Sequence, residues 1–123
     1  MKRTLLLLLT LLIASVALSA AADTLQHVVC FKFKSTATPA DIQRVEDSFR
    51  NLKQQIPQVL TFQCGTNVSL ENLNKGFTHC FTLTFKSAED RDIYLKHPAH
   101  KAFGKVVGPV MADVFVIDYW VKP

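Results

Sequence analysis

Segments with the periodicity of strands and of helices alternate along this chain in an order that few folds can accommodate. Alternating or β-branched apolar residues predict four strands, at residues 26–34, 58–68, 77–86 and 113–121. Apolar residues at steps of three and four predict a helix after the first strand, at residues 39–56. Helical patterns also follow the third strand over residues 88–107, with an interruption at His97 before Pro98. With right-handed crossovers, the order β-α-β-β-α-β gives an antiparallel four-stranded sheet with its helices on one face. We therefore predict an α+β, ferredoxin-like fold.

Capping sequences mark where each helix is expected to begin. Thr38 supplies an N-cap hydroxyl ahead of a proline at the first helical position, and Ser87 supplies another ahead of two acidic residues. Pro98 excludes helical backbone at His97, which we interpret as a turn residue. The same proline can start a separate helix, and this would place His100 in the first turn of that helix.

The first 22 residues have the pattern of a secretory signal peptide. Two basic residues follow the initial methionine, residues 5–18 are almost entirely apolar, and small residues occupy 19–22. The apolar stretch is short for a membrane span, which needs about 20 apolar residues, so an uncleaved anchor is the less favoured alternative. We predict cleavage near Ala21 or Ala22 and a single domain over residues 23–123. The protein is then expected to be secreted or periplasmic, without stable membrane association.

Charge argues against one broad class of partner. The chain has 14 Lys and Arg against 10 Asp and Glu, but two of the basic residues lie in the predicted signal peptide. The remaining domain carries 12 basic and 10 acidic side chains, which are interspersed along the sequence. A nearly neutral domain without a basic cluster has no electrostatic basis for binding nucleic acid, so we expect no nucleic-acid partner.

The predicted sheet has a second face that the helices leave uncovered. Val28, Cys30 and Cys80 point to this face, together with residues of the final strand. An apolar-to-mixed surface of this extent is typical of an interaction site. Two copies packed sheet against sheet would bury it, and we therefore predict a homodimer.

The three cysteines allow at most one disulfide within the chain. Cys30 and Cys80 lie on strands that are neighbours in the predicted topology, and both point to the face without helices. A Cys30–Cys80 bridge is therefore one hypothesis. The alternative is that these two residues and Cys64 are buried free thiols.

Six short motifs are spread over most of the predicted domain. They are His27-Val28-Val29, Gly76-Phe77-Thr78-His79, Phe85-Lys86-Ser87-Ala88-Glu89, Tyr94-x-x-His97-Pro98-Ala99-His100, Phe103-Gly104 and Asp118-Tyr119. Together they resemble the stress-responsive A/B barrel (Dabb) family over residues 25–121, and the His-Pro-x-His element after a tyrosine is the most specific of them. The resemblance implies a dimeric α/β barrel, in agreement with the dimer expected from the sheet pattern.

The resemblance also implies roles for particular side chains. One plant member of the family is a polyketide cyclase that performs an aldol cyclisation, and His100 and Tyr94 match its catalytic histidine and tyrosine. An aldol step needs a base near neutral pKa, which a histidine provides, and a hydrogen-bond donor for the developing oxyanion, which a tyrosine provides. The predicted ligand pocket lies under the helices and is lined by His27, His79, Phe31 and Phe81.

Each of these polar side chains also has a structural explanation. Buried histidines often bond to backbone groups, and a buried tyrosine is often a core aromatic residue. We interpret the chain as a binding or stress-related module of undefined activity, with a small apolar or carbonyl-containing ligand. The alternative is an acid/base enzyme, cyclase-like or lyase-like, that acts on a small carbonyl compound with His100 as base and Tyr94 as donor.

Two further function classes are less favoured. A metal site formed by the four histidines ranks last because their spacing matches no strong metal motif, so we expect neither a metal nor a cofactor. Export argues against a polyketide substrate, since such intermediates are made and handled inside the cell.

Overall fold

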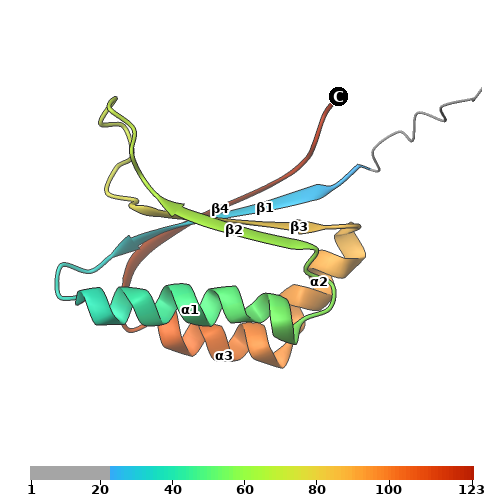
Figure 1. Cartoon of the computed structure of the whole chain (residues 1–123), viewed down its shortest axis with the longest axis horizontal. Helices are drawn as coiled ribbons and strands as arrows, with labels where there is room; N and C mark the ends of the chain where they lie inside the picture. The colour runs from blue at the N-terminus through green and yellow to red at the C-terminus, as the bar shows by residue number, and fades with distance from the viewer. Residues whose placement is uncertain (1–22) are drawn as a thin grey trace, which may run out of the picture.

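The computed structural model describes residues 23–123, and the predicted signal peptide lies outside the described residues. The elements in chain order are β1 (Leu25–Phe33), α1 (Pro39–Gln55), β2 (Thr61–Thr66), β3 (His79–Phe85), α2 (Ala88–Lys96), α3 (Pro98–Val107) and β4 (Met111–Trp120). Figure 1 shows the strands in one layer and the helices together on one side of it. The predicted order of strands and helices is confirmed.

The four strands form one antiparallel sheet with the order β2-β3-β1-β4. This is the ferredoxin-like arrangement, so the predicted α+β fold is confirmed. Strand β1 lies between β3 and β4, and its residue His27 is opposite Leu83 on one side and Asp118 on the other. Because opposite residues in a sheet share a face, this register decides which distant side chains meet under the helices.

The helices begin where the capping sequences predict. The Thr38 hydroxyl accepts a hydrogen bond from the Asp41 backbone at 3.2 Å, and the Asp41 carboxylate accepts one from the Thr38 backbone at 3.0 Å. Ser87 caps α2 in the same way, through the Asp90 backbone at 3.0 Å. His97 has a more definite role than a turn residue, because its Nδ1 accepts from the Ala99 backbone at 3.0 Å and caps α3.

The second strand is shorter than its sequence pattern suggests. Residues 58–68 were expected to be extended, whereas β2 covers only Thr61–Thr66. The Val59 backbone donates to the Ile56 carbonyl at 3.1 Å, and both side chains are buried. Apolar residues that look like the start of a strand therefore form a turn that seals the end of α1.

Aromatic side chains form the centre of the core between the sheet and the helices. The Phe49 ring from α1 stacks on Phe103 from α3, with centroids 4.5 Å apart, and lies 4.7 Å from Phe81 of β3. Phe31 of β1 completes this group, 5.4 Å from Phe81. These contacts pack α1 and α3 against the same part of the sheet, and aromatic side chains fill the space between the two layers.

Strand β4 and the helix-free face of the sheet remain apolar and exposed. Phe115, Ile117 and Tyr119 are each about half exposed, at 50%, 49% and 49%. The register places Ile117 opposite Val28 and Phe115 opposite Cys30, on the face away from the helices. This arrangement agrees with the uncovered face expected from the sequence.

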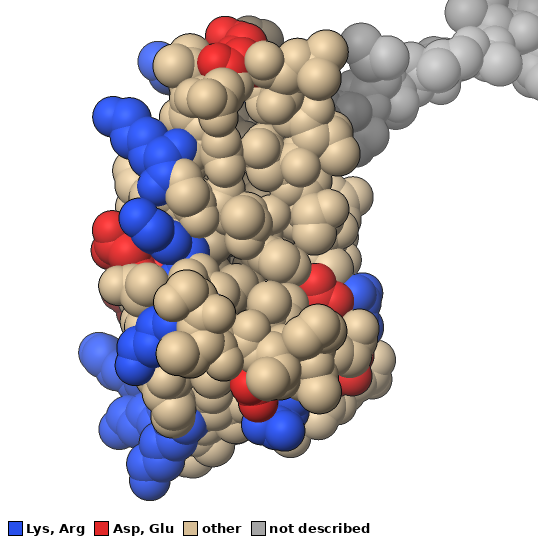
Figure 2. All heavy atoms as spheres, turned by 90° about the vertical axis from the view of Figure 1, so that its left-hand side faces the viewer, with Lys and Arg blue, Asp and Glu red and all other residues tan. Residues whose placement is uncertain are grey.

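Charged side chains are unevenly distributed over the end of the molecule that Figure 2 draws. Figure 2 shows one end of the molecule, where Lys and Arg follow one side, Asp and Glu are interspersed, and much of the surface carries no charge. Among the described residues, no helix combines the length and the apolar character needed to span a bilayer.

Candidate functional site

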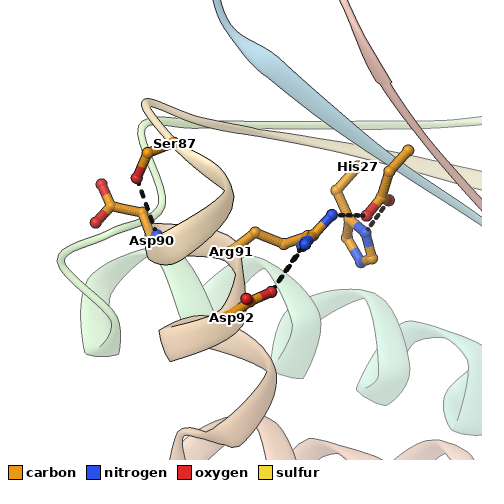
Figure 3. Close-up of polar contacts among 6 residues, drawn as sticks. His27, Ser87, Asp90, Arg91 and Asp92 are labelled. Carbon is orange, nitrogen blue, oxygen red and sulfur yellow. Dashed lines mark hydrogen bonds and ion pairs between the residues drawn. The ribbon is translucent and has the colours of Figure 1, made fainter.

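A buried histidine on β1 is paired with an aspartate on β4. The His27 Nδ1 atom lies 2.6 Å from Oδ1 of Asp118, and His27 is only 4% exposed. Arg91 of α2 donates from Nη1 to the other carboxylate oxygen of Asp118 at 3.1 Å and from Nη2 to Asp92 at 2.9 Å. Figure 3 shows how His27 and the Arg91 guanidinium approach the same carboxylate from β1 and α2. With His27 neutral, the Nδ1–H donates to Asp118, so the pair fixes the tautomer of the ring.

Tyr94 lies beside this pair and is fully buried. Its ring centroid is 5.6 Å from that of His27 and 4.6 Å from that of His100. Its hydroxyl has no hydrogen-bond partner among the described residues. Burial, with a smaller contribution from the Asp118 charge, raises the pKa of Tyr94 well above its ordinary value. The phenol therefore remains a proton-bearing donor at any physiological pH.

His100 completes the cluster from α3. It is the third residue of that helix and is partly exposed. Burial lowers the pKa of His100, and His27 lowers it further when it is itself protonated, while a hydrogen bond with the Leu95 backbone opposes the shift. The imidazole is therefore neutral near pH 7 and able to accept a proton.

The structure brings together three of the four polar side chains predicted for the pocket. His27, Tyr94 and His100 form one cluster, whereas His79 lies elsewhere in the layer between the sheet and the helices. His79 is opposite Phe31 in the sheet, four residues along β1 from His27, which corresponds to a separation of about 13 Å. Its Nε2 atom lies 3.4 Å from the Glu46 carboxylate, and its Nδ1 lies 2.8 Å from the Thr78 hydroxyl.

The two phenylalanines predicted for the pocket lie in the core. Phe31 is 2% exposed and Phe81 is 0% exposed, and both pack against Phe49. Phe81 lies opposite Val29, between the positions of His27 and His79 along the sheet, whereas Phe31 lies directly opposite His79. Their contribution to ligand binding stays a prediction.

Sequence reasoning missed two members of the cluster, Asp118 and Arg91. Asp118 was noted only as part of a family motif, although it is the one acid between Val116 and Trp120 on the same face of its strand. A lone carboxylate among apolar residues on one face of a strand is a signal that could have found it. Arg91 lies one helical turn before Tyr94, a spacing that places both on the same side of α2.

Two surface cavities of the described part of the chain lie away from this cluster. One, of about 540 Å³, lies beneath the β2–β3 connection on the helix-free side and is lined by Cys30, Cys80, Phe77 and Phe115 among others. The other, of about 580 Å³, is a polar depression along α1. Neither is lined by His27, Tyr94 or His100. Neither cavity therefore opens onto the cluster, whose partly exposed member is His100.

The histidines also fall into separate environments with respect to metal binding. His79 lies near Glu46, and His97 uses its Nδ1 to cap α3. Within residues 23–123, no group of three or more His, Cys, Asp or Glu side chains is arranged to hold a metal ion.

The geometry of the cluster suits proton transfer next to a carbonyl group. A neutral imidazole could accept a proton from carbon, and a protonated phenol could donate a hydrogen bond to the oxygen on which negative charge develops. The ring of His27, held by Asp118, forms the third side of this arrangement.

Comparison with known proteins identifies close relatives of the chain. The family model of the stress-responsive A/B barrel domain, Dabb, matches residues 25–121. The chain is 37% identical over 94 residues to the stress-response A/B barrel domain-containing protein HS1 of Arabidopsis thaliana, covering 76% of this chain and 86% of that protein. It is 32% identical over 94 residues to olivetolic acid cyclase of Cannabis sativa, covering 76% and 93% of the two chains.

Solved structures support the same relationship. A crystal structure of an Arabidopsis thaliana protein has a TM-score of 0.75 and 37% identity, covering 80% of this chain and 94% of that chain. A protein of unknown function from Thermobifida fusca, described as dimeric and ferredoxin-like, has a TM-score of 0.71 and 20% identity, covering 85% and 96%. At that identity the second likeness concerns the fold alone.

Proposed function

The chain belongs to the stress-responsive A/B barrel (Dabb) family, and we propose that it is an exported homodimer that binds a small, largely apolar ligand with a carbonyl group. The ligand site is the cluster of Tyr94, His100 and His27. The carbonyl oxygen of the ligand accepts a hydrogen bond from the Tyr94 hydroxyl, and its apolar part lies against the neighbouring aromatic rings.

The unpartnered hydroxyl of Tyr94 carries this proposal. A buried donor without an acceptor costs about 1–3 kcal/mol, and most native structures avoid that cost. A phenylalanine at this position would pack equally well without it. The presence of a hydroxyl at position 94 is explained if a ligand supplies the acceptor. A ligand oxygen that approaches beside the partly exposed His100 would be such an acceptor.

A second candidate function is acid/base catalysis on the same ligand class. The lowered pKa of His100 and the protonated state of Tyr94 favour it. In this reaction His100 takes a proton from the carbon beside the carbonyl, and the C–H electron pair moves onto the carbonyl oxygen. Tyr94 then donates a hydrogen bond to the resulting enolate. The relationship to olivetolic acid cyclase supports a reaction of this kind without identifying the substrate.

We expect Tyr94→Phe to stabilise the protein while it weakens ligand binding. Removal of the unpartnered hydroxyl should raise the free energy of unfolding by about 1 kcal/mol, and loss of the donor should weaken binding of 2-heptanone about tenfold. Urea denaturation and NMR titration with 2-heptanone measure the two effects. Tyr119→Phe, on the helix-free face, is the matched control and should change neither quantity. A Tyr94→Phe variant that binds the ketone like wild type, or a wild type that does not bind it, contradicts the proposed site.

The same ketone separates a binding protein from an enzyme. An enzyme should accelerate exchange of the ketone's α-protons into deuterated water, and His100→Gln should remove that acceleration while largely preserving affinity. A binding module should hold the ketone without any acceleration.

Export is proposed from the N-terminal pattern. We expect the full chain, produced in a host with a secretory route, to be recovered outside the cytoplasm with residues 1–21 or 1–22 removed. N-terminal sequencing and intact mass check this result. Leu8→Arg, which places a charge in the apolar stretch, should leave the chain uncleaved and inside the cell. A full-length exported chain, or a wild type that remains in the cytoplasm, contradicts it.

A further inference from the structure

Two cysteines face each other directly across the centre of the sheet. Cys30 of β1 and Cys80 of β3 are register partners, and both point to the helix-free face. Opposite residues of antiparallel strands have Cα atoms about 4.5–5.5 Å apart. A disulfide requires about 4.4–6.8 Å. The backbone therefore needs no rearrangement to bring the two sulfur atoms within bonding range.

In a single protomer the cysteine pair is open to a small reagent, whereas the proposed dimer would cover this face of the sheet. Cys80 is exposed and Cys30 is partly buried beside it. Both line the cavity of about 540 Å³ below the β2–β3 connection. That volume is within the range of small-molecule clefts, so a low-molecular-weight disulfide can enter and reach the thiols while the protomers are apart.

The third cysteine is kept apart from this pair. Cys64 of β2 is opposite Phe81, whose side chain lies in the core, so Cys64 points to the helix side of the sheet. Its sulfur accepts a hydrogen bond from Arg50 Nη2 at 3.1 Å. The sheet therefore separates Cys64 from Cys30 and Cys80, and this leaves one possible pairing within a protomer.

We propose that Cys30 and Cys80 form a reversible disulfide within one protomer by exchange with a small disulfide. The more exposed Cys80 attacks first as its thiolate and forms a mixed disulfide, which releases one thiol of the oxidant. The Cys30 thiolate then attacks the Cys80 sulfur, closes the bridge and releases the second thiol. The two cysteines lose two electrons and two protons, and the small disulfide is reduced to two thiols.

The order of attack follows from the surroundings of the two sulfur atoms. Burial, together with the hydrogen bond and charge of Cys80, raises the pKa of Cys30 to about 11. Cys30 is thus rarely a thiolate near neutral pH, and it reacts efficiently only after the mixed disulfide places a target sulfur next to it.

The bridge constrains a long stretch of the chain. It joins β1 to β3 and closes the segment between residues 30 and 80, which contains α1 and β2. Cross-linking a loop of this size removes much of the entropy of the unfolded chain. We expect oxidation to raise the Tm by about 10 °C.

Thiol counting by mass spectrometry tests the proposal. The protein is diluted until it sediments as a monomer, incubated with oxidised or reduced glutathione, unfolded, and treated with N-ethylmaleimide. The reduced protein should take up three labels and the oxidised protein one, and in tryptic digests the peptide that ends at Lys32 should be joined to residues 76–86. Cys64→Ser, the matched control, should still oxidise and then take up no label, whereas Cys80→Ser should form no bridge and show no redox-dependent Tm.

Other outcomes contradict the proposal. Three labels after oxidation would show that the pair does not close. A bridge that includes Cys64, or a covalent dimer on a non-reducing gel, would show that a different pairing is preferred. An oxidised wild type with the same Tm as the reduced protein would show that the bridge does not constrain the fold.

Discussion

Replacement of Asp118 by alanine is expected to destabilise the protein by about 2–3 kcal/mol. Asp118 accepts from both His27 and Arg91, and the Asp118→Ala substitution leaves the two donors facing an apolar gap under the helices. The loss of the acceptor costs more free energy at His27, because His27 is almost fully buried, than at Arg91, which retains Asp92 as a partner.

The loss should also release the His27 ring from its fixed tautomer. In the wild type the Nδ1–H is held by the carboxylate, and in Asp118→Ala the proton is free to shift to Nε2. Nitrogen chemical shifts of the imidazole detect this change independently of stability, and urea denaturation measures the destabilisation. Because His27 contacts Tyr94, affinity for 2-heptanone should fall as well.

Asp92→Ala is the matched control for this substitution. It removes the other carboxylate that Arg91 contacts, but the Asp92 side chain is half exposed, so we expect a change below about 0.5 kcal/mol and an unchanged His27 tautomer. Equal effects of the two substitutions would mean that the His27–Asp118 pair has no special role.

Local patterns in the sequence were sufficient to predict the fold. Alternation along β3 and the capping hydroxyls of Thr38 and Ser87 depend on neighbours within a few residues, and they appear in the structure as expected. The predicted start of β2 was wrong, because Val59 is buried in a turn rather than in a strand. Apolar residues next to a proline are compatible with a strand or with a buried turn, and only their packing against the rest of the chain distinguishes these two structures.

The candidate site was less predictable because it depends on register. The alternation of side chains along the strands correctly placed His27 and His79 on the helix side of the sheet. Alternation does not specify where along the sheet each residue lies, and the register separates the two histidines by four residues. His27 and Asp118 are 91 residues apart in sequence. Their contact follows from the alignment of β1 with β4, which no local pattern specifies.

The alignment of β1 with β4 also creates the surface on which the proposed dimer depends. On the helix-free face, Ile117 lies opposite Val28, between Phe115 and Tyr119. These β4 side chains are about half exposed, more than expected for large apolar residues in the middle of a sheet. A second copy packed face to face would cover them.

We expect Ile117→Lys to convert the proposed dimer into a folded monomer. In a twofold interface the substitution occurs twice, and each lysine must lose its water against an apolar surface. A cost of about 2 kcal/mol at each site would raise the dimer dissociation constant about a thousandfold. Sedimentation velocity over a range of concentrations measures the association, and circular dichroism should show an intact fold because Ile117 contributes little to the core of one protomer.

Leu70→Lys is the control that separates this interface from a general effect of added charge. Leu70 lies in the β2–β3 connection and is 99% exposed, outside the sheet face, so its replacement makes the same chemical change without entering the interface. The variant should remain dimeric. If Ile117→Lys is also dimeric, or if the wild type sediments as a monomer at micromolar concentration, the copies do not associate through the helix-free face, and the exposed side chains of β4 must be covered by something other than a second copy of this chain.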